Sequence, residues 1–282
     1  RAFDASAPML RAPMTPAAET RFDRDTHVEL AAPGSYDARI DRGWWVARGP
    51  NGGFIAAILV RAMEHASADP TRQLRSLTVH YLRPPAEGPA RVETRLERVG
   101  GSLTTTSARL FQGDSLQALA LAAFSKPRET ASLHHAVMPE VAPPEASDPR
   151  RDARVPIHER YEQRWAIGPR YFEGARGREA VTGGWLRLAE GTRPLDGALL
   201  AAFADAWPPS AFATSELPML LGGVPTVDLT VHIRARLPQP DDFVLAVFRT
   251  REVADGFLEE DGEIWSRDGR LLAHSRQLGV LL

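Results

Sequence analysis

One carboxylate in the second half of the chain lies in apolar surroundings. Asp205 occurs in the sequence LLAAFADAWPPS, within a stretch at 194–207 that has the length and composition of a buried helix. Removing a carboxylate from water is costly unless the group is paired or has a function. Asp205 is therefore a candidate catalytic base, and the alternative is a carboxylate at a helix end that faces solvent.

The first half offers hydrogen-bond donors at the start of another apolar stretch. Asn51, Gly52 and Gly53 begin NGGFIAAILVRAMEHA at residues 51–66, which predicts a buried helix that follows a Gly-Gly turn. Backbone N–H groups at a helix N-terminus can bind an oxyanion or a carbonyl oxygen. The same three residues could equally be only a helix cap.

Several other chemistries are excluded or lack a motif. The chain has no cysteine, which excludes disulfides, thiolate zinc sites and cysteine nucleophiles. It contains neither the G-x-S-x-G motif of Ser-His-Asp hydrolases nor a Walker or dinucleotide glycine pattern. The sequence HERYE at 158–162 begins like a zinc-protease motif but lacks the second histidine. No metal site is expected.

The composition is that of an ordinary globular protein of 282 residues, 43% hydrophobic and 25% charged, which is large enough for two domains. The net charge of -2 and the pI near 6.5 give no electrostatic footprint for nucleic acid or an anionic membrane. No apolar run approaches the roughly 18 residues of a membrane span, and the start of the chain lacks the apolar core of an export signal. We expect a soluble, cytoplasmic protein in which residues 1–22 are an N-terminal extension and Met14 is a candidate internal start.

Two halves of similar length repeat the same order of elements. A stretch at 129–157 that is rich in Pro, Ala and charge predicts a linker between an N-terminal domain, 23–128, and a C-terminal domain, 158–282. In each half a predicted helix precedes four predicted strands, and the first of these strands contains the phrase LTVH, at 77–80 and 229–232. The repeat indicates a duplicated α+β domain. We predict a double hotdog fold, in which each half is a long helix wrapped by an antiparallel β-sheet.

Five ordered stretches make the chain resemble the acyl-CoA thioesterase II family of double-hotdog enzymes. These stretches, which fall within roughly residues 25–282, are NGGFIAAILVRAM, HYLRPP, LLAAFADAW, PTVDLTVH and LAHSRQLGV. The resemblance implies hydrolysis of acyl-CoA to a free fatty acid and CoA by direct attack of water, without a metal or organic cofactor. It also implies a homodimer or a higher homo-oligomer, since hotdog sheets commonly extend across interfaces.

The resemblance implies a catalytic trio of Asp205 on a helix, Thr226 at the start of a strand and Gln277 on the last strand. Asp205 would orient or deprotonate the attacking water, and Thr226 would share that water or fix the aspartate. Gln277 carries an amide that both donates and accepts, so it would hold the water in line. Without the resemblance, Thr226 and Gln277 are ordinary strand residues.

Two further sets of residues near these motifs are candidates, one for its backbone N–H groups and one for its match to the family. Asn51, Gly52 and Gly53 are predicted to bind the substrate through its thioester carbonyl. Asp228 also matches the family, but Leu229 stands where many members have histidine. Asp228 is therefore left out of the catalytic set.

The duplicated halves differ at the catalytic positions. Aligning the predicted helices places Arg61 opposite Asp205, and aligning the last strands places Ala123 opposite Gln277. The first half lacks both groups. We therefore expect only the second half to carry the catalytic trio, while the first supplies packing and acyl or CoA contacts.

Two other functions remain open from the sequence. The chain could be a hotdog protein that binds acyl-CoA or another apolar ligand without turning it over. It could also be a hotdog hydratase acting on enoyl-CoA, although such enzymes pair an Asp with a His that neither NGGF nor FADAW supplies nearby. Free-thiol release from a panel of acyl-CoAs separates the hydrolase from the binding protein.

Overall fold

The computed structural model describes residues 19–46, 48–150, 155–191, 193–217, 223–235 and 243–282. Residues 1–18 of the predicted N-terminal extension and residues 151–154 of the predicted linker lie outside the described ranges.

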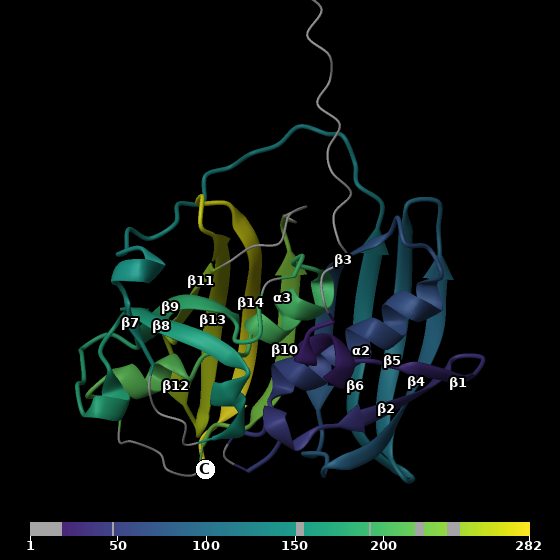
Figure 1. Cartoon of the computed structure of the whole chain (residues 1–282), viewed down its shortest axis with the longest axis horizontal. Coiled ribbons are helices and arrows are strands. Elements are labelled where there is room, and N and C mark those ends of the chain that lie inside the picture. The colour runs from purple at the N-terminus through teal and green to yellow at the C-terminus, as the bar shows by residue number, and fades with distance from the viewer. Residues whose placement is uncertain (1–18, 47, 151–154, 192, 218–222, 236–242) are drawn as a thin grey trace, which may run out of the picture.

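The first half contains two α-helices and the strands of one side of a sheet (Figure 1). The elements are α1 Arg21–Asp25, β1 Glu29–Ala32, β2 Ser35–Ile40, α2 Gly52–Ser67, β3 Gln73–Tyr81, β4 Gly88–Val99, β5 Leu103–Gln112 and β6 Ser115–Ser125, with the 3-10 turn η1 Arg42–Trp44. The predicted order of a helix and four strands is present as α2 and β3 to β6. Strand β5 shows why these segments are strands, because Thr104, Thr106, Ala108 and Leu110 are buried at alternate positions.

The second half begins after a stretch without helix or strand. Its elements are β7 Asp148–Pro149, β8 Tyr161–Ile167, β9 Val181–Leu188, α3 Gly197–Phe203, β10 Thr226–Ile233, β11 Val244–Arg249, β12 Val253–Ala254, β13 Phe257–Ser266 and β14 Leu271–Val280, with the 3-10 turns η2 Pro144–Ala146, η3 Pro156–Glu159, η4 Tyr171–Glu173 and η5 Ser210–Ala213. The four predicted strands are β10, β11, β13 and β14.

The strands of both halves form one antiparallel sheet of 14 strands within the described ranges. The order is β1-β2-β4-β5-β6-β3-β10-β14-β13-β11-β9-β8-β7, and β12 pairs with β13 outside this path. Residues from α2, α3, β3 and β10 belong to the same buried apolar cluster. The two halves therefore share a core as well as a sheet.

The repeated phrase LTVH lies at the centre of this sheet, where β3 pairs with β10. Thr78 is opposite Thr230, with Val79 opposite Leu229 on one side and Leu77 opposite Val231 on the other. The two threonine hydroxyl oxygens lie 3.0 Å apart. The two copies of the phrase thus pair with each other, and a local twofold axis passes between Thr78 and Thr230.

Helix α2 lies on the side of the sheet that also carries α3 (Figure 1). The Asn51 side chain caps it by accepting a hydrogen bond of 3.1 Å from the Phe54 N–H. Ten of its sixteen residues are buried, and it contacts β3 to β6 and α3. No helix within the described ranges combines the length and apolarity that crossing a membrane requires.

Helix α3 is shorter than the prediction of 194–207, and this corrects the predicted position of Asp205. The helix ends at Phe203, so Asp205 lies two residues beyond it in a turn. The sequence Trp207-Pro208-Pro209 keeps the helix from reaching residue 207, because proline has no N–H and disfavours helix in the residue before it.

Candidate active site

Asp205, just after the end of α3, is hydrogen-bonded to residues at the N-terminus of α2. The Asn51 side-chain amide donates to the backbone O and to Oδ2 of Asp205, at 2.7 and 2.8 Å. The Gly53 N–H donates to the same Oδ2 at 2.9 Å. Both of these hydrogen bonds to the carboxylate end on Oδ2.

The surroundings of Asp205 change its acidity. Protein atoms enclose the carboxylate, although part of the residue stays accessible to solvent. This burial raises the pKa of Asp205 to about 7, and the negative charge of Glu260 contributes to the rise. Hydrogen bonds from the Gly52–Gly53 turn and Asn51 oppose it by favouring the ionised form. The result is a carboxylate that can change protonation near neutral pH.

Two tyrosines complete the environment of Asp205. The Tyr81 hydroxyl donates to the carbonyl O of Gly52 at 2.8 Å and so holds the turn that binds the carboxylate. Burial raises the pKa of Tyr81 and of Tyr161, and the Asp205 charge contributes in both cases. The Tyr161 hydroxyl is buried with no hydrogen-bond partner among the described residues. Both phenols therefore stay neutral when Asp205 is ionised.

Thr226 and Gln277 meet on neighbouring strands because of a β-bulge. Strand β10 pairs Leu229 with Gln277 and Thr226 with Gly279, and the register shifts between Thr226 and Asp228. With strict alternation, Thr226 would face away from the side of the buried Leu229; the extra residue of the bulge returns it to that side. The Thr226 hydroxyl donates to Gln277 Oε1 at 3.0 Å.

Glu260 is a site residue that the sequence reasoning missed. It lies on β13 directly opposite Gln277 and is 1% exposed. Gln277 Nε2 donates to Glu260 Oε1 at 2.7 Å, and the Ser210 N–H and hydroxyl donate to Oε2 at 2.6 and 2.7 Å. Burial raises the pKa of Glu260, against these hydrogen bonds. The signal in the sequence was the alternation of β13, which places Glu260 in the buried row with Leu258 and Ile264.

The structure thus places the predicted trio in two parts. Thr226 and Gln277 form one hydrogen-bonded pair, and among the described residues no hydrogen bond joins either of them to the Asp205 carboxylate. Their link is electrostatic, because the charge of Glu260 acts on Asp205 while its carboxylate holds Gln277.

Asn51, Gly52 and Gly53 all lie against Asp205, where the sequence analysis assigned them to the substrate. A Cβ added to Gly52 would lie 3.0 Å from Asp205 Oδ2. The Gly53 N–H and the Asn51 amide already donate to the carboxylate. Their observed contacts hold the aspartate, and their role in substrate binding stays a prediction.

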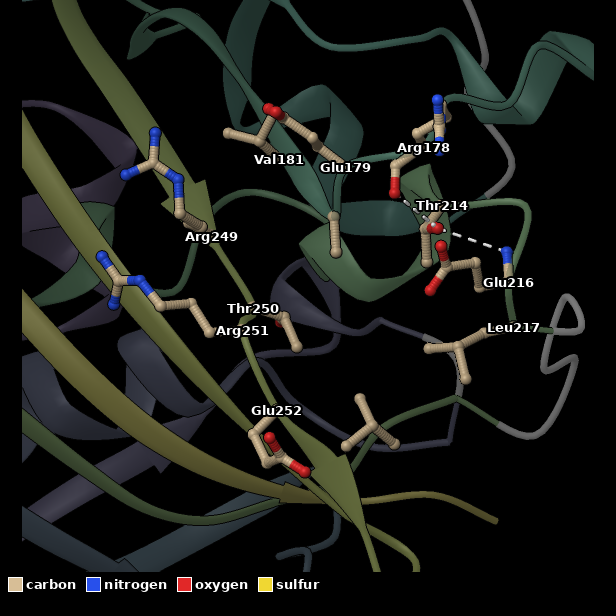
Figure 2. Close-up of a pocket in the computed structure, with 12 residues that line it drawn as sticks. Arg178, Glu179, Val181, Thr214, Glu216, Leu217, Arg249, Thr250, Arg251 and Glu252 are labelled. Atoms are coloured by element: carbon tan, nitrogen blue, oxygen red, sulfur yellow. Dashed lines mark hydrogen bonds between the residues drawn. The ribbon is translucent and has the colours of Figure 1, made fainter.

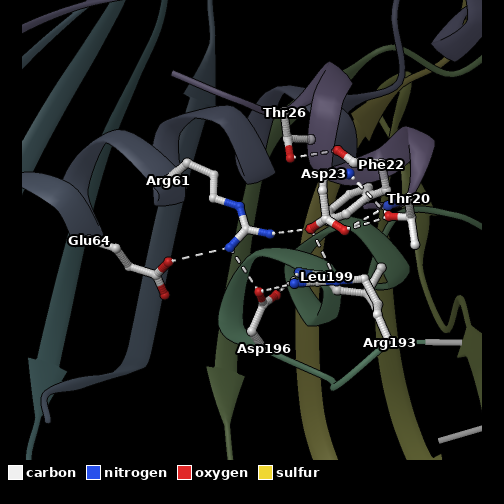
Figure 3. Close-up of polar contacts among 9 residues, drawn as sticks. All are labelled: Thr20, Phe22, Asp23, Thr26, Arg61, Glu64, Arg193, Asp196 and Leu199. Carbon is white, nitrogen blue, oxygen red and sulfur yellow. Dashed lines mark hydrogen bonds and ion pairs between the residues drawn. The ribbon is translucent and has the colours of Figure 1, made fainter. Parts of the chain in front are cut away.

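The corresponding place in the first half holds an ion-pair cluster (Figure 3). Arg61 donates to Asp196, the N-cap of α3, at 2.8 Å, just as Asp205 contacts Asn51, the N-cap of α2. Arg193 pairs with Asp196 at 2.7 Å, and both arginines also pair with Asp23. Burial would raise the pKa of Asp196, but the charges of the two arginines outweigh it and lower the pKa to about 2.

The observed strand pairing shows that the predicted counterpart of Gln277 in the first half was one residue off. Leu229 pairs with Gln277, and its counterpart Leu77 pairs with Ala122, so Ala122 and not Ala123 takes the place of Gln277. The prediction was wrong because the connection between the last two strands is one residue longer in the second half, where Trp265 pairs with Leu271, than in the first, where Phe111 pairs with Leu116. By the same pairing, Thr106 occupies the place of Glu260.

A hollow of about 750 Å³ lies beside this network and is lined by none of the predicted catalytic residues (Figure 2). Residues 249–252 form one wall, and Thr214, Glu216 and Leu217 form the facing one. Thr250 connects the hollow to the site, since its hydroxyl lies 2.9 Å from that of Ser210. The described part of the chain contains no cluster of His, Cys, Asp or Glu that could hold a metal ion.

Comparison with known families assigns the chain in two parts. The acyl-CoA thioesterase N-terminal domain matches residues 41–125, and the acyl-CoA thioesterase C-terminal domain matches residues 139–281. The chain therefore belongs to the acyl-CoA thioesterase family, whose relatives of known structure have the hotdog fold.

Solved structures share this fold along nearly the whole chain. A hotdog-fold protein of unknown function from Alicyclobacillus acidocaldarius is 28% identical, with a TM-score of 0.84 over 93% of this chain and 98% of its own. A protein described as a candidate thioesterase II from Thermobifida fusca is 25% identical, with a TM-score of 0.82 over 96% and 100%. An acyl-CoA thioesterase II from Mycobacterium marinum, 19% identical, has a TM-score of 0.73 over 93% and 98% and shows the fold alone. Comparison with curated proteins gave no significant match.

Proposed function

We propose that the chain hydrolyses acyl-CoA thioesters to a free fatty acid and CoA, with water as the nucleophile and Asp205 as the general base. The observation that carries the proposal is the state of Asp205. Its Oδ2 is held by Asn51 and Gly53, its pKa is about 7, and part of the residue is accessible to solvent. A base with such a pKa is well matched to proton transfer from water near neutral pH.

The reaction would proceed through a tetrahedral intermediate. Water attacks the thioester carbonyl carbon, and its proton passes to the carboxylate of Asp205. The C–S bond then breaks, the carboxylic acid forms, and the proton held by Asp205 passes to the departing sulfur. Asp205 returns to its ionised form, and no covalent acyl-enzyme is required.

The remaining site residues would position the reactants. Thr226 and Gln277 would orient the water, because the Gln277 Nε2 carries a second hydrogen beyond the one donated to Glu260. Asn51, Gly52 and Gly53 would hold the base and lie next to the substrate carbonyl. These roles are supported by the family and by the contacts described above.

We also infer that each half is a hotdog unit, with residues 23–128 and 158–282 as the two units and 129–157 as the connector. The long buried helix α2 supports this for the first half. The second unit would be organised around the seven-residue α3. We propose a homo-oligomer on the basis of the family alone.

The direct test is release of free thiol from a panel of acyl-CoAs that differ in chain length, followed with a thiol reagent. The chain has no cysteine, so the protein adds no thiol signal of its own. In wild type, kcat/KM should rise with pH through about 7, because ionised Asp205 is the active form. Binding of acyl-CoA without thiol release would instead favour the non-catalytic alternative.

Asp205→Asn should lower kcat by about 10²–10⁴-fold with little change in substrate binding, because the amide keeps the shape but cannot accept the proton. Asp228→Asn is the matched control on β10 and should keep activity close to wild type. Near wild-type turnover in Asp205→Asn would place the base elsewhere. Mass spectrometry that detected a trapped acyl-enzyme would replace direct water attack with a covalent route.

A further inference from the structure

Glu260 is a buried carboxylate for which the proposed reaction assigns no role. It is 1% exposed and lies in the inward row of β13, with Leu258, Gly262 and Ile264. Its counterpart in the first half is the uncharged Thr106. A carboxylate in such a position is costly unless both of its oxygens are satisfied.

Both oxygens of Glu260 have hydrogen-bond donors. Ser210 gives two to Oε2, from its N–H at 2.6 Å and its hydroxyl at 2.7 Å, and Gln277 Nε2 gives one to Oε1 at 2.7 Å. The Ser210 hydroxyl is also 2.9 Å from the hydroxyl of Thr250. Glu260 is therefore fixed from η5 on one side and reaches Gln277 on the other.

The carboxylate of Glu260 determines which group donates and which accepts in each hydrogen bond of this network. An ionised carboxylate only accepts hydrogen bonds, so Glu260 requires the NH₂ end of the Gln277 amide to face it. Gln277 Oε1 then faces Thr226, whose hydroxyl has to donate, and the distance between these oxygens is 3.0 Å. With a neutral residue at 260, the amide of Gln277 could turn over and reverse both roles.

We propose that Glu260 is a positioning residue of the active site, whose carboxylate sets the orientation of the Gln277 amide and, through it, of the Thr226 hydroxyl. The inference rests on the proposed hydrolysis. It assigns Glu260 no contact with the substrate. The site then depends on two buried carboxylates with separate tasks, a base in Asp205 and an anchor in Glu260.

The kinetic test compares Glu260→Gln with Glu263→Gln, the same change at an exposed position of the same strand. Ser210 and Gln277 donate to different oxygens of Glu260, and an amide at 260 replaces one of these oxygens with an NH₂ group that cannot accept. We expect kcat to fall about ten- to hundred-fold with little change in KM, because a misplaced positioning group costs rate and not affinity. Glu263→Gln should match wild type.

A double variant separates positioning from a general loss of structure. If Glu260 acts through Gln277, then Glu260→Gln should cost little further activity in a Gln277→Ala background. A full additional loss would overturn the inference. Ser210→Ala, which keeps the carboxylate but removes one of its donors, provides a milder second variant. It should lower kcat several-fold and lower the melting temperature, but the protein should stay folded because the Ser210 N–H still donates to Oε2.

A pH profile gives a readout that a structural role alone would not move. Among the described residues, the ionisable groups that act on Asp205 or are influenced by it are Tyr81 on β3, Tyr161 on β8 and Glu260 on β13, and Glu259 on the same strand acts on Glu260. Removing the negative charge of Glu260 should shift the rising limb of kcat/KM to lower pH, and the ¹³C titration of the Asp205 carboxyl should shift in the same direction. An unmoved carbon titration in a folded Glu260→Gln variant with wild-type kcat would refute the inference. Absence of thiol release in wild type would refute the proposed hydrolysis instead.

Discussion

At the scale of single residues, the proposed catalytic role of Asp205 conflicts with the stability of the folded protein. The enclosure that raises its pKa from 3.8 to about 7 makes it a useful base at neutral pH. The same enclosure makes the ionised form unfavourable in the folded protein. A group tuned in this way lowers the free energy of unfolding under the conditions in which it is active.

We therefore predict that Asp205→Asn stabilises the protein at pH 8 and changes its stability little at pH 4. Between pH 4 and 7 folded wild type keeps a proton that the unfolded chain releases, so its stability falls as pH rises. A shift of about three pKa units corresponds to about 4 kcal/mol once pH exceeds 7. Urea unfolding of both proteins at the two pH values measures the difference. The same effect of the substitution at both would show that Asp205 does not hold this proton.

A sequence identifies a buried polar residue only when the residues next to it along the chain determine whether it is buried. Asp205 could be found because the residues around it are apolar, and Glu260 was detectable by its alternation with Leu258 and Ile264. The bulge that turns the Thr226 side chain toward Gln277 could not be predicted from the sequence. It depends on the register between two strands, and a propensity pattern along one strand does not contain that register.

At the scale of elements, the approach of α2 to α3 depends on glycine. A Cβ at Gly53 would lie 2.6 Å from the carbonyl O of Ala202, and that atom is backbone and cannot turn aside. The Gly53 N–H also donates to Asp205. One residue without a side chain therefore permits both the helix contact and the attachment of the base.

Gly53→Ala should lower the free energy of unfolding by about 1–3 kcal/mol, since the two helices have to move apart. It should also lower kcat, because the donor to Oδ2 moves with the helix. Gly101→Ala is the control, as its Cβ would meet no atom within 4 Å. Chemical denaturation and thiol release measured on both variants check this, and unchanged values for Gly53→Ala would contradict the close helix contact.

A strand with two adjacent glycines, β9, is one of the elements that sequence reasoning missed. Strand β9 contains Gly183 and Gly184, whose added Cβ atoms would lie 2.2 and 2.0 Å from the carbonyl O atoms of Ala246 and Arg164. The neighbouring strands β11 and β8 thus leave no room for side chains there. Glycine weakens the β-strand pattern in a sequence, although here the close packing requires it.

At the scale of the whole molecule, the two halves contribute unequally to the candidate active site. Asp205, Thr226, Glu260 and Gln277 come from the second half, while Asn51 and Gly53 come from the first. At the position equivalent to Asp205 in the first half, Arg61 and Arg193 form ion pairs with Asp196. The sequence placed Arg61 opposite Asp205, although it could not show which partner the arginine binds.

Arg61→Ala should lower stability by about 1–3 kcal/mol, because Asp196 loses one of its two guanidinium partners. Turnover at saturating substrate should stay close to wild type, whereas Asp205→Ala should lose about 10²-fold or more. Melting curves and kcat for the two variants provide the comparison. Equal losses of kcat would mean that the first half also takes part in the chemistry.

The local axis between Thr78 and Thr230 has a consequence for how such a site can arise. In a dimer of identical chains, every substitution appears twice, so an arginine that closes one site would close both. Joining two copies in one gene removes that constraint, and one half can then carry Arg61 while the other keeps Asp205. Gene fusion therefore allows a substitution to change one of the two related positions and leave the other unchanged. A chain with the two halves paired in this way should bind one equivalent of a tight inhibitor, where a dimer of single units would bind two.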